Sequence, residues 1–409
     1  MEVLYARCAG LDVHKDTVVA CARWIESGKA QYAVQTFGTV TSELLRLADW
    51  LMEHGCTHVA MEATGVYWRP VWAVLEGAEA FELVLANAAH VKNVPGRKTD
   101  VNDATWLADL LAHGLIKASF VPPAHVQQTR ELSRTRKQLV QEVTSHTLRI
   151  QKVLETCNIK LSSLLSDVRG KSGRAILDAI VRGENDPKKL AALADHRVRA
   201  KREDLEESLK GRVTEHHRFL LKLHLTQADQ LEEAVRDVEA RLGDALKPFR
   251  EKLERVAELP GLDVRSASAI VSEIGFDMKR FETPDKLVSW STLCPRMDET
   301  AGKRRNTRIR KGGTWLKPVL VQAAWNAVRT KRSYLRAKFL RLKARRGAKK
   351  AIVAIAASML RAIWHILAYD VRYQDLGPDY QAVDKEKIAR RLRVRLEALG
   401  YNVQLSAAA

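Results

Sequence analysis

The 409-residue chain has few cysteines and no pattern that would connect them. The five stand at positions 8, 21, 56, 157 and 294, and no two form a Cys-x-x-Cys pair. This argues against a disulfide-stabilised secreted scaffold and favours a reducing compartment. The N-terminus also lacks a basic region followed by an apolar core, so no signal peptide is expected. Cys8 and Cys21 fall in apolar runs, and we expect them to be small core residues.

An uninterrupted apolar run long enough to cross a membrane is also missing. The nearest approach is the segment from Ala351 to Tyr369, which Arg361 and His365 interrupt and which follows a basic stretch. Ionisable residues inside a membrane span are costly. We therefore predict a buried helix for this segment.

Acidic residues are absent from Lys303 to Lys350, a stretch with eighteen Lys and Arg residues. That number nearly equals the formal net charge of the whole chain, +19. A solvated surface normally mixes both signs, and aromatic residues also occur in this run. The run is typical of a nucleic-acid path, and its binding is expected to fall steeply with salt. The candidate contacts in it are Lys303, Arg304, Arg305, Arg308, Arg310, Lys311, Arg345, Arg346, Lys349 and Lys350.

Two carboxylates three residues apart occur in the segment Gly96-Arg97-Lys98-Thr99-Asp100-Val101-Asn102-Asp103-Ala104. An apolar helical pattern follows, and positions i and i+3 share a helix face, so Asp100 and Asp103 can point at one spot. An ordinary helix start is the alternative, because Thr99 suits an N-cap and acids suit a first turn. Arg97 and Lys98 are further candidate nucleic-acid contacts.

The predicted order of elements brings in two more acids. Short strands are expected near 9–13, 17–22 and 32–36, then a helix over 42–55, a strand over 58–63, a helix over 67–75, a strand over 81–85 and the Asp100 helix. Asp12 stands at the end of the first strand and Glu62 on the fourth. This βββαβαβα order resembles the ribonuclease H/RuvC-like α/β fold, in which Asp12, Glu62, Asp100 and Asp103 would converge.

Four adjacent carboxylates repel one another and need a compensating cation. Oxygen ligands of this kind suit Mg²⁺ or Mn²⁺. A pair of such ions could activate an attacking oxygen and stabilise a leaving one in phosphodiester chemistry. Each acid alone has an ordinary alternative: Asp12 as a turn residue at the end of a strand, and Glu62 as a solvated residue at the rim of the sheet. The four acids in this order favour a metal site.

The middle of the chain has two charged segments with spaced apolar residues, 127–154 and 213–256, without proline before Pro248. They predict two long helices in an antiparallel coiled-coil arm, or an ordinary helical bundle, because the heptads are irregular. Such an arm offers a surface for self-association or nucleic acid.

The segment Leu259-Pro260-Gly261-Leu262 then precedes a predicted helix over 265–274, an order that resembles the helix-hairpin-helix motif. There Gly261 and the hairpin amides would hold a phosphate. A plain helical corner is the alternative. The remainder of the chain is expected to be mainly helical.

Several motifs together resemble the transposases of insertion-sequence family 110, the bridge-RNA-guided recombinases, over nearly the full length. The motifs are Gly10-Leu11-Asp12, Glu62-Ala63-Thr64-Gly65, Lys98-Thr99-Asp100 with Asp103-Ala104, Leu259-Pro260-Gly261, and Cys294-Pro295 through Lys311-Gly312. The resemblance implies a RuvC-like Asp-Glu-Asp-Asp domain, here 1–125, joined to a transposase domain, here 257–372. From the residue pattern we expect the helical arm at 126–256 between them and a basic tail at 373–409.

The resemblance also implies roles for single residues. Asp12, Glu62, Asp100 and Asp103 would bind Mg²⁺, and the family's nucleophilic serine falls on Thr300, a departure from the family pattern. Threonine still offers a hydroxyl, but its methyl group stiffens χ1 and crowds an in-line attack. Either Thr300 attacks, and does so slowly, or this copy is impaired. Ser289 and Ser291 are the nearest serines, but they do not match the family position.

The partners implied are double-stranded donor and target DNA, a structured guide RNA that pairs with both, and further copies of the chain in a dimer or tetramer. The implied location is the bacterial cytoplasm, at the nucleoid. No zinc finger or other base-reading module precedes Lys303, which agrees with recognition delegated to an RNA. Two alternatives remain: a RuvC-like nuclease of branched DNA that works without RNA, and a catalytically decayed transposase that only binds nucleic acid.

Overall fold

A computed structural model describes residues 3–63, 65–87, 91, 103–295, 298–300, 303–306, 308–310, 312–381 and 385–404. The chain divides into two compact units, Met1–Pro122 and Pro123–Ala409. Each unit is described by itself.

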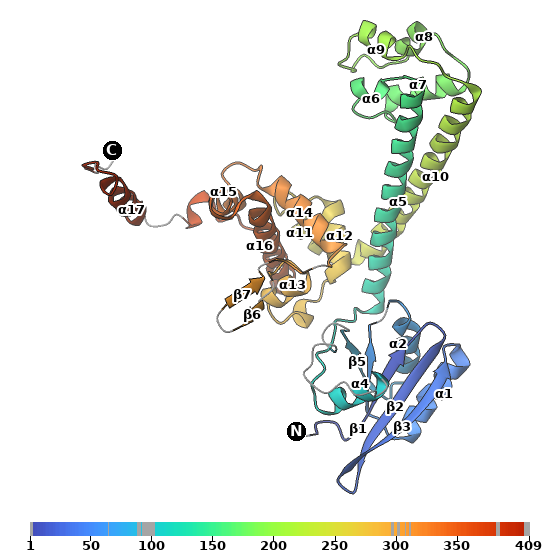
Figure 1. Ribbon diagram of the computed structural model, residues 1–409, viewed down its shortest axis with the longest axis vertical. Coiled ribbons are helices and arrows are strands. Elements are labelled where there is room, and N and C mark those ends of the chain that lie inside the picture. Colours follow the sequence, from blue (N-terminus) through green and yellow to red (C-terminus); the bar gives the residue numbers. More distant parts are fainter. Residues whose placement is uncertain are drawn as a thin grey trace. The chain divides into compact units, whose positions relative to one another are not determined.

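The first unit is built on a mixed five-stranded sheet with helices on both faces (Figure 1). The strands are β1 (Arg7–Val13), β2 (Thr17–Glu26), β3 (Lys29–Gly38), β4 (His58–Glu62) and β5 (Glu82–Ala86), in the spatial order β3-β2-β1-β4-β5. The first three form an antiparallel meander, and β4 and β5 run parallel to β1. The helices are α1 (Thr41–Glu53), α2 (Trp68–Gly77) and α4 (Asp103–Ala112). The predicted order βββαβαβα is confirmed.

Alternation along β1 sends its side chains to two different cores. Ala9, Leu11 and Val13 pack with α1 and α2 on one face. Cys8 packs with Leu111 and Ala112 of α4 on the other face, as β-strand geometry requires of the intervening positions. The prediction that Cys8 and Cys21 are core residues is confirmed, since both are fully buried. Burial raises the pKa of the Cys8 thiol to about 12 and also raises that of Cys21, so both remain protonated thiols.

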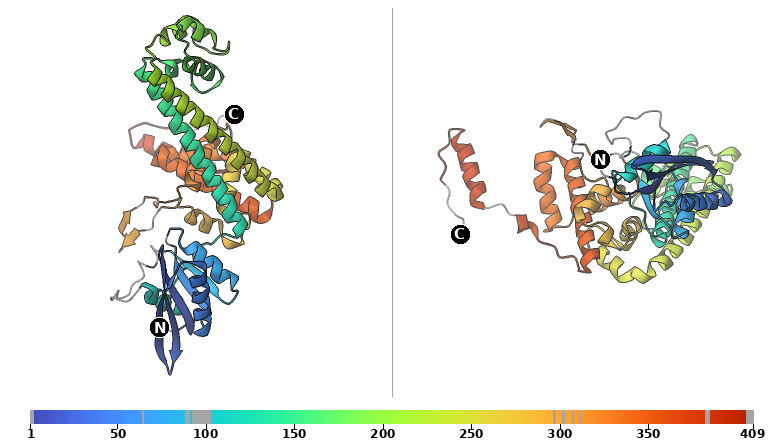
Figure 2. Two further views of the ribbon diagram at one scale, coloured as in Figure 1. Left: turned by 90° about the vertical axis from the view of Figure 1, so that its right-hand side faces the viewer. Right: turned by 90° about the horizontal axis from the view of Figure 1, so that it is seen from below.

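The second unit begins with two long helices that lie side by side, α5 (Ala124–Thr156) and α10 (Glu215–Leu246) (Figures 1 and 2). Two long helices were predicted here and are confirmed. The second ends at Leu246 rather than near 256, because the turn η1 (Lys247–Phe249) contains Pro248, which cannot donate a helical hydrogen bond. Along α5, all of which is described, no residue from 130 to 149 is fully buried. Whether the pair is a coiled coil remains a prediction.

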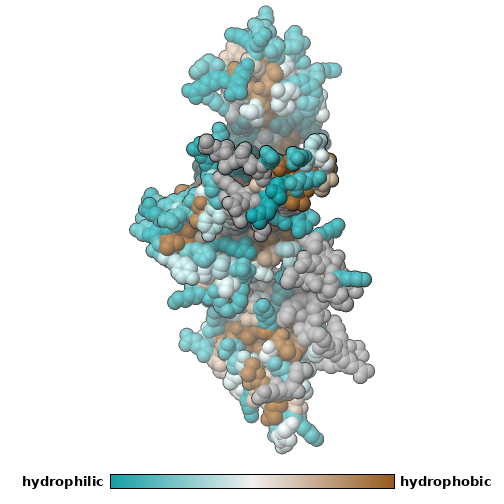
Figure 3. All heavy atoms as spheres, turned by 90° about the vertical axis from the view of Figure 1, so that its left-hand side faces the viewer, coloured by the Kyte–Doolittle hydropathy of each residue, from teal (hydrophilic) through white to brown (hydrophobic). Residues whose placement is uncertain are grey.

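A small helical lobe connects the C-terminal end of α5 to the N-terminal end of α10, and we call it the tip lobe (Figure 1). It contains α6 (Leu161–Leu164), α7 (Lys171–Val181), α8 (Pro187–Ala192) and α9 (Arg202–Ser208). Its core joins Ile176 and Ile180 of α7 to Leu154 of α5 and Leu221 of α10. Figure 3 shows hydrophilic side chains over most of this lobe, at the top of the view, around smaller hydrophobic patches.

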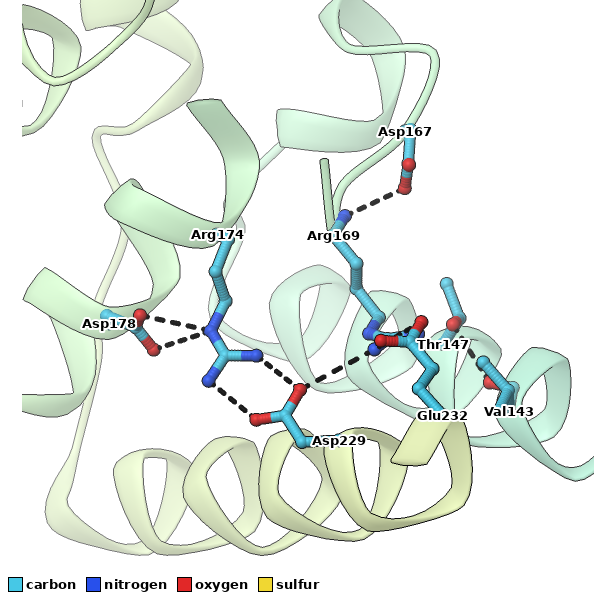
Figure 4. Close-up of polar contacts among 8 residues, drawn as sticks. All are labelled: Val143, Thr147, Asp167, Arg169, Arg174, Asp178, Asp229 and Glu232. Carbon is cyan, nitrogen blue, oxygen red and sulfur yellow. Dashed lines mark hydrogen bonds and ion pairs between the residues drawn. The ribbon is translucent and has the colours of Figure 1, made fainter. Parts of the chain in front are cut away.

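Ion pairs fasten the tip lobe to α10 (Figure 4). The Arg174 guanidinium donates through Nη1 to Asp229 Oδ1 at 2.5 Å and through Nη2 to Oδ2 at 2.7 Å. Its Nε donates to Asp178 Oδ1 at 2.9 Å. Arg169, whose side chain is nearly buried, pairs with Glu232 at 2.9 Å. Hydrogen bonds from Arg174 lower the pKa of Asp229 below its usual value.

We expect an Asp229→Asn substitution to destabilise the tip lobe by about 1 kcal/mol at pH 7, since the bidentate pair is only partly exposed. The folded-state pKa of Asp229 is depressed, so its contribution is present above the unfolded pKa and is lost as the pH falls through the folded pKa. Hydrogen exchange of the α7 amides should therefore differ between variant and parent at pH 7, and the difference in opening free energy should shrink towards pH 3. Glu233→Gln, on the exposed side of α10, is the control. Equal protection of α7 at pH 7 would contradict the prediction.

Most of the remaining helices of the second unit pack in a bundle around α16 (Ala348–Tyr369). The other elements are α11 (Arg250–Ala257), α12 (Val264–Ile274), η2 (Met278–Arg280), α13 (Pro284–Trp290), β6 (Asp298–Thr300), β7 (Lys303–Asn306), α14 (Leu316–Ala327), α15 (Tyr334–Arg346), η3 (Pro378–Gln381) and α17 (Lys385–Glu397). Among the described helices, α16 is the one long and apolar enough to cross a membrane, and 61% of its apolar window is buried. Its residues Ile355, Leu360 and Ile363 are inaccessible to solvent, which agrees with the predicted buried helix.

Candidate active site

Helix α4 lies directly against β1 at Gly10. A Cβ atom added at Gly10 would be 2.2 Å from the Ala104 carbonyl oxygen and 2.5 Å from the Ala108 amide nitrogen. Only glycine permits this contact between a strand and the backbone of a helix. The Cys8 thiol, two residues earlier on the same face, donates to the Ala108 carbonyl at 3.5 Å. Because Cys8 meets Ala108 and Gly10 meets Ala104, α4 runs antiparallel to β1, and its N-terminal end points towards Asp12.

Asp12 stands on the α4 face of β1, two residues after Gly10. Its side chain is 22% exposed, and Oδ2 lies 3.1 Å from His14 Nε2. The His14 ring is itself largely exposed, so this pair contributes little to stability. Asp12 is therefore a carboxylate at the rim of the sheet with solvent access.

Glu62 lies at the matching place on the neighbouring strand. Strands β1 and β4 are parallel, with Leu11 opposite Met61, and Glu62 is the residue after Met61. Leu11 and Met61 both belong to the core under α1 and α2, so the next residue on each strand, Asp12 or Glu62, faces the α4 side. Glu62 is half-buried.

Asp103 is the first residue of α4 and is exposed. Three of the four predicted acids thus occupy the same end of one sheet face. Asp100, the fourth, lies outside the described residues. Within the described part of the chain, no three His, Cys, Asp or Glu side chains are grouped closely enough to hold a metal ion. The donor set, oxygen only and at a solvent-accessible rim, fits a hard divalent cation in its chemistry.

A partly buried ion pair holds α4 in its place over the sheet. Arg23 of β2 is 4% exposed, and its Nε donates to Asp109 Oδ1 of α4 at 2.9 Å. The Tyr32 hydroxyl of β3 donates to the same oxygen at 2.8 Å. Burial and the adjoining Asp109 carboxylate raise the pKa of Tyr32, so the hydroxyl keeps its proton. Sequence reasoning missed this set, although an arginine inside the apolar strand Ala20-Cys21-Ala22-Arg23-Trp24 was a usable signal.

Thr300 is the last residue of β6, which forms a short antiparallel hairpin with β7 in which Thr300 pairs with Lys303. The described geometry of Thr300 is that of its backbone. The hairpin belongs to a loop between α13 and α14. Ser289 lies within α13. Ser291, the residue that follows this helix, is buried and donates to the Val288 carbonyl at 2.8 Å. That hydrogen bond gives Ser291 a structural role.

The predicted nucleic-acid contacts form two described groups on the second unit. Lys303, at the start of β7, and Arg308 and Arg310, in the segment after the hairpin, are exposed. Arg345 and Arg346 end α15, and Lys349 and Lys350 lie in the first turn of α16 beyond Gly347, all four exposed. Arg304 and Arg305 lie on β7, and their side chains, like Arg97, Lys98 and Lys311 as a whole, fall outside the described residues. Whether these residues bind nucleic acid remains a prediction.

Gly261 lies in the turn between α11 and α12, with φ at +86°. A Cβ atom there would be 2.3 Å from the Ala323 carbonyl oxygen of α14 and 2.5 Å from the Ala327 amide. Glycine at this position is thus required by the conformation and by packing on α14. Asp263 caps α12 in a capping box with Ser266. A phosphate contact by this turn remains a prediction.

Comparison with known proteins identifies the family. One family model, a DEDD-type transposase of the IS110 group, matches residues 9–159, which include Asp12, Glu62, Asp100 and Asp103. A second, described as Transposase IS116/IS110/IS902 family, matches residues 253–340, which include Thr300 and most of the basic run. Together the two matches cover more than half of the chain. No curated protein matches it. Domains of the DEDD type generally use divalent metal ions. The chain therefore belongs to the IS110 family of transposases, enzymes that recombine DNA.

Proposed function

We propose that this transposase cuts and exchanges donor and target DNA strands with the Thr300 hydroxyl as nucleophile and with Asp12, Glu62, Asp100 and Asp103 as its acidic site. The observation that carries the proposal is the arrangement around Gly10. Strands β1 and β4 bring Asp12 and Glu62 to one edge, and the close contact at Gly10 directs the N-terminus of α4, with Asp103, to the same edge. Asp100 precedes this helix by three positions in the sequence.

The chemical step is a transesterification. The Thr300 oxygen forms a bond to the phosphorus of a DNA phosphodiester, and the hydroxyl proton is lost. The bond between phosphorus and one deoxyribose oxygen breaks, and that oxygen takes up a proton as a free sugar hydroxyl. Attack on the protein–DNA ester by a sugar hydroxyl of the other DNA reverses the step and releases Thr300. No oxidant or energy source is consumed, because one phosphodiester replaces another.

The four acids would hold Mg²⁺, or Mn²⁺ in its place, and a bound divalent cation supplies charge stabilisation to the attacked phosphate. A carboxylate of this acidic site would accept the proton from the attacking hydroxyl. Basic residues of the hairpin and of the segment after it, such as Lys303 and Arg308, would hold the DNA backbone without reading its sequence.

Sequence choice is proposed to come from a structured guide RNA that pairs with both DNAs, as the family resemblance implies. The two-helix arm, as a coiled coil, would bring copies together as a dimer or tetramer, and the turn at Gly261 would contribute a phosphate contact. We keep the division at 1–125, 126–256, 257–372 and 373–409 as the working description of these four parts. The alternatives are a RuvC-like nuclease that ignores Thr300, and a decayed copy without catalysis.

The test is denaturing electrophoresis of the full-length protein incubated with Mg²⁺, the structured RNA of its own element and labelled donor and target DNA. We expect a protein–DNA adduct that disappears in Thr300→Ala and persists or increases in Thr300→Ser, because serine lacks the crowding methyl group. Thr57→Ala, at an exposed threonine just before β4, is the matched control.

The alternatives give different gels. Cleaved DNA without an adduct, unaffected by Thr300→Ala, would overturn the nucleophile assignment and indicate a metal-dependent nuclease. Binding without cleavage by the parent and by Thr300→Ser would indicate a decayed copy. An adduct that forms equally well without RNA would remove the guide RNA from the proposal.

A further inference from the structure

The loop that carries Thr300 leaves the helical bundle after α13 and returns to it before α14. We call residues 291–293, where the loop leaves the bundle, its first root, and residues 312–314, where it returns, its second root. The first root is held in place, because Ser291 and Leu293 are each only 3% exposed. Between them stands Thr292, with φ at +61°. A β-branched residue rarely adopts this left-handed conformation, and such strain persists only where surrounding contacts enforce it.

The second root lies against the first at the glycine pair Gly312-Gly313. A Cβ atom at Gly313 would be 2.5 Å from Thr292 Oγ1 and 3.0 Å from the Ser291 carbonyl oxygen. Both glycines have positive φ, +106° and +64°. The two roots can therefore approach this closely only because Gly313 carries no side chain, whereas Gly312 is favoured by its backbone conformation alone.

The Lys317 ammonium joins the two roots. Lys317 lies in the first turn of α14, where a cation opposes the helix dipole and needs other compensation. Its Nζ donates to Thr292 Oγ1 at 3.2 Å and to the Arg310 carbonyl at 3.3 Å. The Thr292 hydroxyl donates to the Gly312 carbonyl at 3.4 Å. One side chain thus bridges the segment before the hairpin and the segment after it.

Further out, the two arms of the loop meet in an isolated bridge between Pro295 and Ile309. On the far side of the second root, Lys137 of α5 donates to the Thr314 carbonyl at 3.1 Å and lies 5.1 Å from the centre of the Trp315 ring. Arg134 of α5 contacts the same ring. The loop base is therefore held between α5 and α13, with Lys317 at its centre.

We propose that Lys317 is a positioning residue for strand transfer: it closes the base of the loop and so fixes where the β6–β7 hairpin presents Thr300. The inference rests on the proposed function of Thr300. Lys317 acts through the backbone of the loop and not on the phosphate. Loss of its ammonium would free the two roots and let the hairpin move relative to the bundle.

The experiment compares Lys317→Met and Lys317→Arg in the full-length protein. The charge-matched control is Lys279→Met, at an exposed lysine of η2. The adduct assay gives the maximal rate and the half-saturating DNA concentration, and hydrogen exchange is followed in peptides covering residues 288–316. We expect Lys317→Met to lower the maximal rate about 10- to 100-fold, the size of effect that a misplacement near 1 Å causes, with unchanged half-saturation. Exchange should accelerate in the same peptides. Lys317→Arg should restore most of the rate, because a guanidinium can donate to the same two oxygens.

Three results would overturn the inference: an unchanged rate in Lys317→Met, an altered half-saturation with an unchanged maximal rate, or unchanged exchange at the loop roots. The second result would make Lys317 a phosphate contact. Failure of the proposed function looks different, because the parent then forms no adduct or Thr300→Ala still forms one. In that case exchange alone decides whether Lys317 closes the loop, and unchanged exchange rejects it.

Discussion

An Asp12→Asn protein is expected to form the covalent DNA adduct about a thousandfold more slowly than the parent, or not at all, while its fold is retained. Asparagine has nearly the same shape but carries no charge, so the acidic edge loses a metal ligand and part of its negative electrostatic potential. The contact with His14 is largely exposed and contributes little to stability. Thermal stability without metal should therefore be close to that of the parent.

The measurement pairs the adduct assay with titration of Mn²⁺ into the free protein by calorimetry, which reports the site without catalysis. Asp12→Asn should weaken Mn²⁺ binding in step with activity. Asp16→Asn, an exposed acid in the turn after β1, is the matched control and should behave like the parent. Full adduct formation by Asp12→Asn in Mg²⁺ would remove Asp12 from the acidic site.

A Gly10→Ala substitution is expected to destabilise the first unit by about 3 kcal/mol, the upper end of the usual range for overpacked sites. The added methyl group would meet the Ala104 carbonyl at 2.2 Å and the Ala108 amide at 2.5 Å. Both are backbone atoms of α4, so a rotamer change cannot relieve the clash and the helix must shift. The partly buried Arg23–Asp109 pair, which depends on the position of α4, would be strained as well.

Urea unfolding followed by circular dichroism measures the stability, and hydrogen exchange in α4 localises the effect. Gly77→Ala in α2 is the control, since a Cβ atom there meets nothing within 4 Å. It should be neutral or slightly stabilising. If both alanine variants unfold at the urea concentration of the parent, the close contact between Gly10 and α4 is not needed for the stability of the first unit. Because Asp103 begins α4, Gly10→Ala should also lower activity although it changes no acid.

Much of the first unit followed from local pattern. Strands β1 to β3 alternate or run apolar between tight turns at 14–16 and 27–28, and α1 repeats leucine at helical spacing, so these elements are specified by residues close in sequence. The long helix α5 was readable for the same reason. The end of α10 was placed too late, because charged and apolar residues continue past Pro248, although this proline lies in the turn between α10 and α11 and marks the boundary.

Some residues of the candidate site could likewise be predicted from the sequence, and others could not. The acids could be named because their order along a βββαβαβα chain is itself a pattern, and Asp12 and Glu62 fall at strand ends. The partners that position them could not be named. Arg23 pairs with Asp109, 86 residues away, and Lys317 reaches Thr292, 25 residues away. Neither separation corresponds to any repeat of a helix or a strand.

The element types, the acids at the ends of β1 and β4, the basic run from Lys303 to Lys350 and the buried character of α16 follow from residue order, since each depends on local periodicity or composition. Only the folded chain reveals that Gly10 serves the contact with α4, that Gly261 packs on α14, and that one lysine joins the two roots of the loop carrying Thr300. These are contacts between segments distant in the chain. They arise from close packing and hydrogen-bond geometry in three dimensions, which residue order does not record.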